Sequence, residues 1–148
     1  MKKQKGFTLI ELIAVIILLG IITAAGIAQF NAFSSNDTLR ARDDVIAGLV
    51  YAQQVAMARD SASNPITFRY QASQFSVLEN GGPLQGGAVS YPVVLPNTVV
   101  ISNPGTLNYN KLGQSVNALG QPITTTINIV GADGVTPIVV QGSGYANY

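Results

Sequence analysis

Side chains that commonly carry out chemistry are scarce in this sequence. It contains no cysteine and no histidine, which excludes a conventional catalytic triad, a thiol nucleophile and a zinc site with the usual ligands. We therefore expect no enzymatic activity, no catalytic residue, no metal site and no cofactor. The acids beyond the N-terminal region are Asp37, Asp43, Asp44, Asp60, Glu79 and Asp133.

Three of these acids are candidate site residues. Asp43 and Asp44 are adjacent, so on a helix they point about 100° apart, which favours a solvated face over an acid–base pair. Asp133 and nearby carbonyls could bind calcium, but a single aspartate in a tight turn usually serves the turn itself.

The one acid in an unusual position is Glu11. It lies in an apolar run, Phe7 to Ala28, whose 22 residues would span about 33 Å as a helix, enough to cross a bilayer core. A carboxylate there costs at least about 3 kcal/mol unless it is paired. No basic residue follows before Arg40, and Lys5 is six positions away. Glu11 either complements the helix dipole or meets a positive chain end from another molecule; we favour the second.

The charges around this run predict its orientation. Lys2, Lys3 and Lys5 precede it, and by the positive-inside rule they place the N-terminus in the cytoplasm. The rest of the chain should then lie outside the inner membrane.

The segment KKQKGFTLIEL, Lys2 to Leu12, resembles the leader and cleavage junction of type IV prepilins and of type II secretion pseudopilins. The resemblance implies that a prepilin peptidase cleaves between Gly6 and Phe7 and methylates the new amine of Phe7. It also implies that Glu11 neutralises the Phe7 amine of the preceding subunit during assembly. Glycine at the cleaved bond lets a protease approach the backbone closely.

Two features bear on this resemblance. Many family members have a proline where this chain has Ala28, so a kink is not predicted there; Gly20 and Gly26 favour close helix packing. The competing interpretation is a secretory signal peptide cleaved after Gly26, which would make Ile27 the first mature residue. The length of the run and its carboxylate argue against it.

Helical periodicity continues beyond the apolar run. From Leu39 to Met57, we expect one broad face to pack on a globular head, with Arg42 unexplained in its middle. Residues 31–38 are the weak point, with Ser35 or Asn36 as an N-cap if the helix breaks. The helix should end near Ser61 to Pro65. The predicted face is Leu39, Val45, Ile46, Leu49, Val50, Ala52, Gln53, Ala56 and Met57.

The remainder has the period of β-strands. We predict a hairpin from Ile66–Tyr70 and Phe75–Leu78, and a second from Ile123–Val130 and Val135–Gln141 around a turn at Asp133. Further predicted segments are a turn at Glu79–Pro83, short strands at Val89–Leu95 and Val99–Ser102, a turn at Asn103–Gly105, and an edge or surface tail at 142–148.

The predicted class is α+β, with a long N-terminal helix packed on an antiparallel β-sheet head. The predicted segments are a leader at 1–6, a transmembrane assembly helix at 7–28, its amphipathic continuation at 29–62 and a β-rich head at 63–148. The helix at Arg40–Ala62, followed at once by a strand, is similar to H-class minor pilins and pseudopilins, or to a mannose-sensitive haemagglutinin-type minor pilin. Major pilins commonly close a disulfide loop, and this chain has no cysteine.

The resemblance implies a minor subunit of a type IV pilus-like filament, or alternatively a minor pseudopilin of a type II secretion system; a soluble secreted binding protein ranks third. The implied partners are other pilin subunits, prepilin peptidase and an inner-membrane assembly platform. Before assembly the chain would be a single-pass inner-membrane protein with a periplasmic head, and afterwards part of a surface pilus or periplasmic pseudopilus. Its last 37 residues contain no lysine or arginine, so nucleic acid is not an expected partner. The sequence does not exclude an adhesive role, and it assigns no ligand to such a role.

Overall fold

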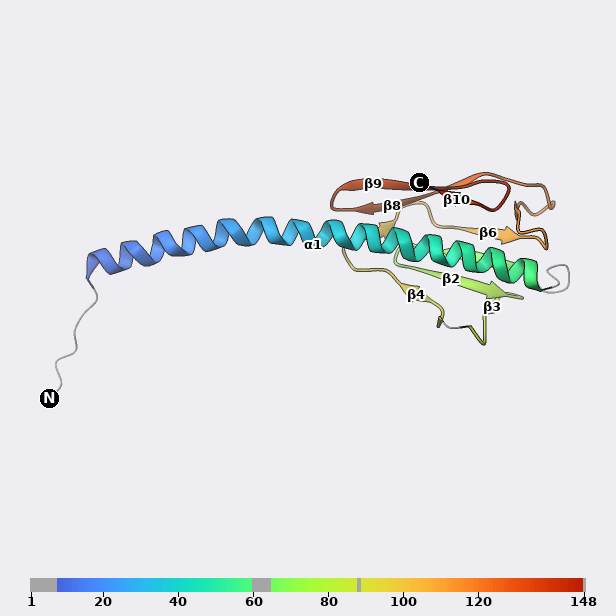
Figure 1. Ribbon diagram of the computed structural model, residues 1–148, viewed down its shortest axis with the longest axis horizontal. Helices are drawn as coiled ribbons and strands as arrows, with labels where there is room; N and C mark the ends of the chain where they lie inside the picture. Colours follow the sequence, from blue (N-terminus) through green and yellow to red (C-terminus); the bar gives the residue numbers. More distant parts are fainter. Residues whose placement is uncertain (1–7, 60–64, 88, 148) are drawn as a thin grey trace. The chain divides into compact units, whose positions relative to one another are not determined.

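The computed structural model describes residues 8–59, 65–87 and 89–147, with the side chains of residues 24–35 left aside. These residues divide into two compact units, Met1–Phe33 and Ser34–Tyr148, with the break inside the helix α1, Leu9–Ala58. Ten short strands follow the helix (Figure 1). The strands are β1 (Ile66–Tyr70), β2 (Gln74–Glu79), β3 (Gly82–Pro83), β4 (Val93–Val94), β5 (Val100–Ile101), β6 (Gly105–Tyr109), β7 (Ser115–Val116), β8 (Thr125–Gly131), β9 (Gly134–Val140) and β10 (Ala146–Asn147).

All strand pairs among these residues are antiparallel, and they form two sheets. The larger sheet has the order β3-β2-β1-β6-β7, with β4 beside β2; the smaller has the order β10-β9-β8-β5. The predicted α+β class with antiparallel sheets is confirmed. Packing of the whole long helix on the head, and the three segment boundaries after residues 6, 28 and 62, remain predictions.

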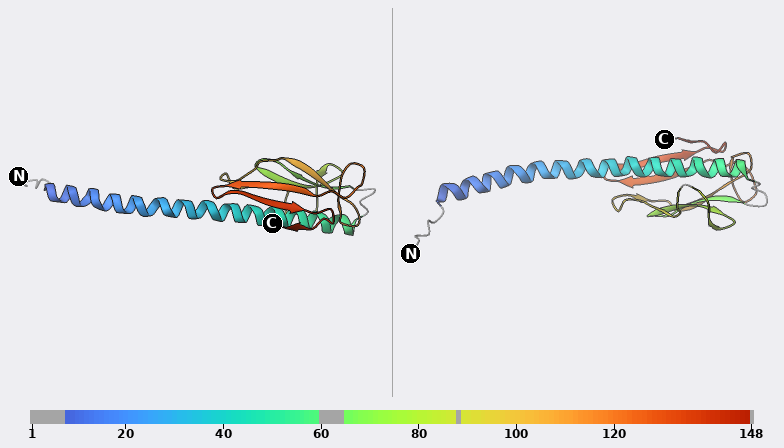
Figure 2. Two further views of the ribbon diagram at one scale, coloured as in Figure 1. Left: turned by 90° about the horizontal axis from the view of Figure 1, so that it is seen from above. Right: turned by 60° about the horizontal axis from the view of Figure 1, so that its bottom comes forward.

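The core of the second unit lies where its part of α1 meets the inner faces of both sheets (Figures 1 and 2). Helix residues Val45 and Leu49 are fully buried with Phe68 of the larger sheet and Ile127 of the smaller one. Alternate residues of β1, β6 and β8 point inward, as expected for strands with one buried face.

Two glycines let the helix approach the sheets closely. At Gly48, an added Cβ would lie 2.6 Å from Cε2 of Phe75. At Gly131, at the end of β8, an added Cβ would collide with the hydroxyl of Thr38, which is buried. Side-chain bulk at either position would push α1 away from one of the sheets.

The predicted helical face was partly wrong. The buried stripe consists of Thr38, Ala41, Val45, Gly48, Leu49, Ala52, Val55 and Ala56. Leu39, Val50 and Met57, predicted as buried, are 49%, 39% and 50% exposed. Small residues occupy the closest approach, because the larger aliphatic side chains would hold the helix off the sheets. The buried stripe is therefore rotated from the predicted face toward Ala41 and Gly48.

The helix boundaries also differ from the prediction. The backbone of α1 is helical through residues 31–38, so neither Ser35 nor Asn36 is an N-cap. The helix ends at Ala58, before the predicted end near Ser61 to Pro65, most of which lies outside the described residues. Arg59 then pairs with Glu79, joining the helix end to β2. Arg42 forms an ion pair with Asp43, with 2.8 Å between Nη2 and Oδ1.

The two predicted hairpins are present as β1–β2 and β8–β9. The turn at Glu79–Pro83 is tighter than predicted: Asn80 and Gly81 have positive φ, and β3 begins at Gly82. The strand at Val89–Leu95 contracts to β4, Val93–Val94. The strand β6 was not predicted, although it pairs with β1 along its full length.

Candidate functional site

The candidate site is the beginning of the N-terminal helix. Gly6 and Phe7, the predicted cleavage and methylation residues, lie outside the described residues, as do the leader charges Lys2, Lys3 and Lys5. The described part of the site begins at Thr8, and α1 begins at Leu9.

Thr8 and Glu11 form a reciprocal cap at the start of α1. The backbone N–H and the hydroxyl of Thr8 both donate to Oε2 of Glu11, at 2.9 and 2.8 Å. The backbone N–H of Glu11 in turn approaches the Thr8 hydroxyl at 3.4 Å. This is a capping box, in which an N-cap threonine and a glutamate three residues later satisfy the unpaired N–H groups of the first turn.

This contact was not predicted, although the sequence contains its pattern. Residues 8–11 read TLIE, which fits the S/T-x-x-E pattern of a capping box. The helix dipole and a positive chain end were the partners predicted for Glu11, whereas the contact in the structure is with a neutral side chain. Thr8 supplies hydrogen bonds but no positive charge, and both contacts use Oε2; no described residue bonds Oε1. Glu11 is thus oriented by its own chain while its charge remains uncompensated by any residue that the structure describes.

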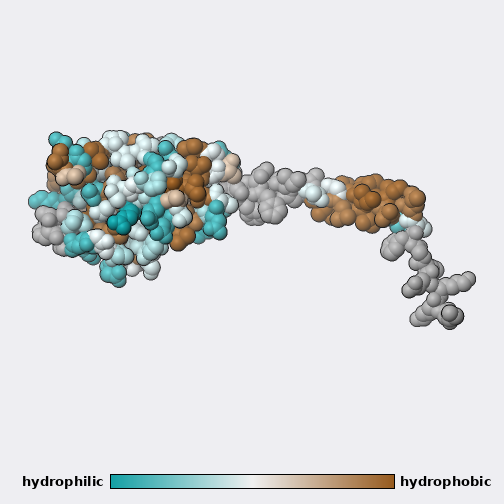
Figure 3. Space-filling model, turned by 180° about the vertical axis from the view of Figure 1, so that it is seen from behind, coloured by the Kyte–Doolittle hydropathy of each residue, from teal (hydrophilic) through white to brown (hydrophobic). Residues whose placement is uncertain are grey.

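The side chains that follow Glu11 are apolar and exposed. Every residue from 9 to 23 is exposed, and the apolar side chains among them form the brown segment of the helix in Figure 3. The large ones range from Ile13, at 44%, to Leu9, at 76% exposed. Such a continuous apolar surface indicates contact with lipid or with other protein chains.

Thr23 and Gly20 differ from the large apolar residues of this surface. The hydroxyl of Thr23 donates to the carbonyl of Leu19 at 2.7 Å, so it presents no free donor outward. Around Gly20, an added Cβ would meet nothing within 4 Å. No close contact within the described chain therefore requires glycine at position 20, which is compatible with the close packing of a neighbouring helix.

No helix among the described residues is both long enough and apolar enough to cross a membrane.

The other candidate acids have different surroundings. Asp43 pairs with Arg42, whereas Asp44 lines a cavity in the head. Asp133 lies at the β8–β9 turn. Within the described part of the chain, no three acidic side chains are grouped so that they could hold a metal ion.

Comparison with known proteins identifies the N-terminal segment. Residues 1–27 match the family model of the prokaryotic N-terminal methylation motif. This motif is the signal of type IV pilins and pseudopilins, so the predicted resemblance is confirmed at that level. It points to a structural subunit that assembles with other pilin subunits after processing by prepilin peptidase, from a membrane-anchored precursor. No curated protein and no solved structure matches the chain.

Proposed function

We propose that this chain is a minor structural subunit of a type IV pilus-like filament. Prepilin peptidase cleaves it between Gly6 and Phe7 and methylates the Phe7 amine. Residues 7–28 hold the precursor in the inner membrane, with the lysine-rich leader in the cytoplasm and the head in the periplasm. An inner-membrane platform then moves the subunit into a filament at the cell surface.

The observation that carries this proposal is the environment of the Glu11 carboxylate. Its carboxylate is held by Thr8 at the start of an exposed apolar helix, within the methylation motif, and has no described cation. In an apolar environment an uncompensated carboxylate and an uncompensated terminal amine are each costly, and pairing removes most of both costs. Glu11 of one subunit therefore recruits the Phe7 amine of the next and sets the register between their helices.

The absence of cysteine favours a minor subunit or a pseudopilin over a major pilin, because major pilins commonly close a disulfide loop. The alternative is a minor pseudopilin, which uses the same helix packing in a secretion system. Deleting the chain separates the two: loss of surface pili supports the pilus, and loss of protein secretion with intact pili supports the pseudopilus.

Substitution of Glu11 tests its proposed role, and the capping box provides a matched pair of variants. Glu11→Gln removes the charge but retains the cap, because glutamine also serves at this position. Thr8→Ala retains the charge but weakens the cap. We expect Glu11→Gln to be cleaved normally yet incorporated at least about tenfold less, the effect of roughly 1.4 kcal/mol or more. Thr8→Ala should be incorporated within about threefold of the unaltered chain.

The measurement is the amount of chain in sheared filaments relative to the membrane fraction, with mass spectrometry of the mature N-terminus. Normal incorporation of Glu11→Gln would show that the charge does not set the register. A mature chain that begins at Ile27 would instead support the signal-peptide alternative.

A further inference from the structure

The head contains a short tandem repeat that builds two equivalent turns. Residues 110–114 read NKLGQ and residues 117–121 read NALGQ, so the pattern N-x-L-G-Q recurs after seven residues. The first turn, between β6 and β7, contains Lys111 and Leu112. The second, after β7, contains Ala118 and Leu119 at the same positions.

The same hydrogen bonds hold both turns. In the first, Oδ1 of Asn110 accepts from the backbone N–H groups of Leu112 and Gln114, each at 3.0 Å. In the second, Oδ1 of Asn117 accepts from those of Leu119 and Gln121, at 2.9 and 3.0 Å. Each asparagine also donates to its glutamine side chain, and glycine occupies the left-handed position at Gly113 and Gly120.

Each turn exposes its leucine instead of burying it. Leu112 is 68% and Leu119 is 82% exposed. A large apolar side chain on a turn fixed by its own hydrogen bonds loses little entropy when it binds, which favours contact with a partner.

The first turn is further fixed by α1. Nε2 of Gln53 donates to the Gly113 carbonyl at 2.9 Å, and a Cβ at Gly113 would lie 2.9 Å from Sδ of Met57. Around Gly120 an added Cβ would meet nothing within 4 Å. The first turn also carries a cation, Lys111, which forms no ion pair with any described residue.

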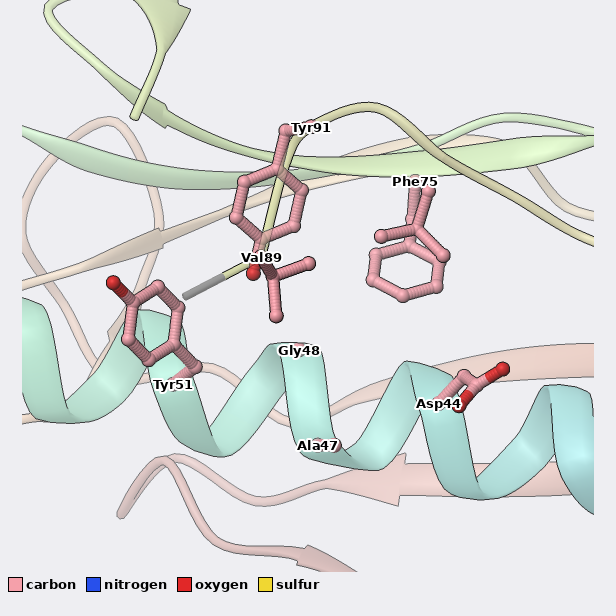
Figure 4. Close-up of a pocket in the computed structure, with 8 residues that line it drawn as sticks. Asp44, Ala47, Gly48, Tyr51, Phe75, Val89 and Tyr91 are labelled. Atoms are coloured by element: carbon pink, nitrogen blue, oxygen red, sulfur yellow. The ribbon is translucent and has the colours of Figure 1, made fainter. Parts of the chain in front are cut away.

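A matching cavity lies at the other edge of the same sheet. It has a volume of about 260 Å³ and lies between α1 and the segment that contains β4. Gly48 and Ala47 form its floor, and Tyr51, Phe75, Val89 and Tyr91 form its walls (Figure 4). Asp44 lies at one end of it, and no described residue forms an ion pair with that carboxylate.

We propose that Leu112 and Lys111 of one copy of this chain occupy this cavity on a second copy. The leucine enters the apolar part, and the lysine pairs with Asp44 at its end. The turn and the cavity are different surfaces, and they lie at opposite edges of the larger sheet. A contact between two different surfaces is head-to-tail, so it can repeat from one subunit to the next along a filament. The inference rests on the proposed function, because filament assembly brings successive heads together.

Cross-linking tests the contact directly, because the chain has no cysteine of its own. Full chains with Leu112→Cys and full chains with Val89→Cys are mixed in detergent micelles and treated with a short bismaleimide. We expect dimers from the mixture, no more than background from either variant alone, and ladders from a chain carrying both substitutions. Dimers from Leu112→Cys alone would indicate a symmetric contact and overturn the proposal, as would no dimers from the mixture.

The second turn supplies the matched control. Leu119→Cys has the same turn geometry but alanine in place of lysine, and its yield with Val89→Cys should be at least about fivefold lower. Equal yields from the two turns would overturn the assignment to Lys111 and Leu112.

A charge exchange tests the ion pair. Lys111→Glu in the Leu112→Cys chain should lower the mixed yield about threefold to tenfold, and adding Asp44→Lys in the Val89→Cys chain should restore it. Circular dichroism checks that each variant is folded, and Asp44→Asn replaces Asp44→Lys if the latter unfolds. A yield unaffected by Lys111→Glu overturns the proposed pair.

The result is independent of the Glu11 experiment, because micelles require no filament. A failed cross-link with normal Glu11-dependent incorporation overturns only this contact. A successful cross-link with Glu11-independent incorporation overturns only the register role of Glu11.

Discussion

At the scale of single residues, the Tyr109 hydroxyl is the buried side-chain polar atom that lacks a hydrogen-bond partner among the described residues. Tyr109 is 2% exposed and ends β6 within the core. An unpaired buried hydroxyl costs about 1–3 kcal/mol, because it gives up its bonds to water without replacement. Burial of the ring therefore stabilises the head, whereas the unpaired hydroxyl lowers its free energy of unfolding.

We therefore predict that Tyr109→Phe raises the free energy of unfolding by about 1 kcal/mol. The matched control is Tyr145→Phe, since Tyr145 is 61% exposed and its hydroxyl can contact water. Urea denaturation followed by circular dichroism measures both. A loss of stability in Tyr109→Phe would mean that the hydroxyl has a partner, such as a buried water.

At the scale of elements, Gly20 and Gly48 of α1 have different surroundings. Gly48 faces Phe75 and Phe68 in the core, whereas Gly20 has no described neighbour within 4 Å of an added Cβ. Alanine improves intrinsic helix stability by about 1 kcal/mol at either position. At Gly48 the steric cost of about 1–3 kcal/mol opposes that gain.

We predict that Gly48→Ala lowers the free energy of unfolding of the head by about 1 kcal/mol, whereas Gly20→Ala leaves it unchanged. In filament assays we expect the opposite ranking of the two variants. Gly20→Ala should be incorporated less well than Gly48→Ala, because its Cβ separates packed helices. Head stability is measured by urea denaturation and incorporation by the filament-to-membrane ratio. Normal incorporation of Gly20→Ala would show that no helix packs closely at that position.

At the scale of the whole molecule, the head should lose stability in alkaline solution. Burial raises the pKa of Tyr91 to about 12, with a smaller contribution from Tyr51, and burial also raises the pKa values of Tyr70 and Tyr109. In the unfolded chain these phenols ionise near pH 10. Above that pH the unfolded state holds fewer protons than the folded state, so stability falls as pH rises.

We expect these tyrosines to contribute a constant amount to the free energy of unfolding below about pH 10. Above that pH their contribution should fall progressively, up to about pH 12 for Tyr91. Tyr91→Phe should make the decline in stability between pH 10 and 12 shallower. Urea denaturation at a series of pH values measures the slopes. A Tyr91→Phe chain with an unaltered slope would contradict the raised pKa.

The sequence by itself determined the features that depend on residues close together along the chain. The leader, the apolar run and Glu11 form a local pattern that the methylation motif matches, and the hairpins β1–β2 and β8–β9 follow from alternating side chains around short turns. The Thr8–Glu11 cap and the repeat at Asn110 and Asn117 are also local patterns of the sequence, although neither was predicted.

Only the tertiary structure decided the features that depend on residues far apart along the chain. The strand β6 pairs with β1 across 35 or more positions, and its segment GTLNY has too few apolar residues to reveal a strand by itself. The buried stripe of α1 is set by the closest approach to the two sheets, which selects Ala41, Gly48 and Ala52 over bulkier neighbours. The placement of the lysine-bearing turn and the Asp44 cavity at opposite sheet edges has the same origin, because strand order is a long-range property that no local pattern encodes.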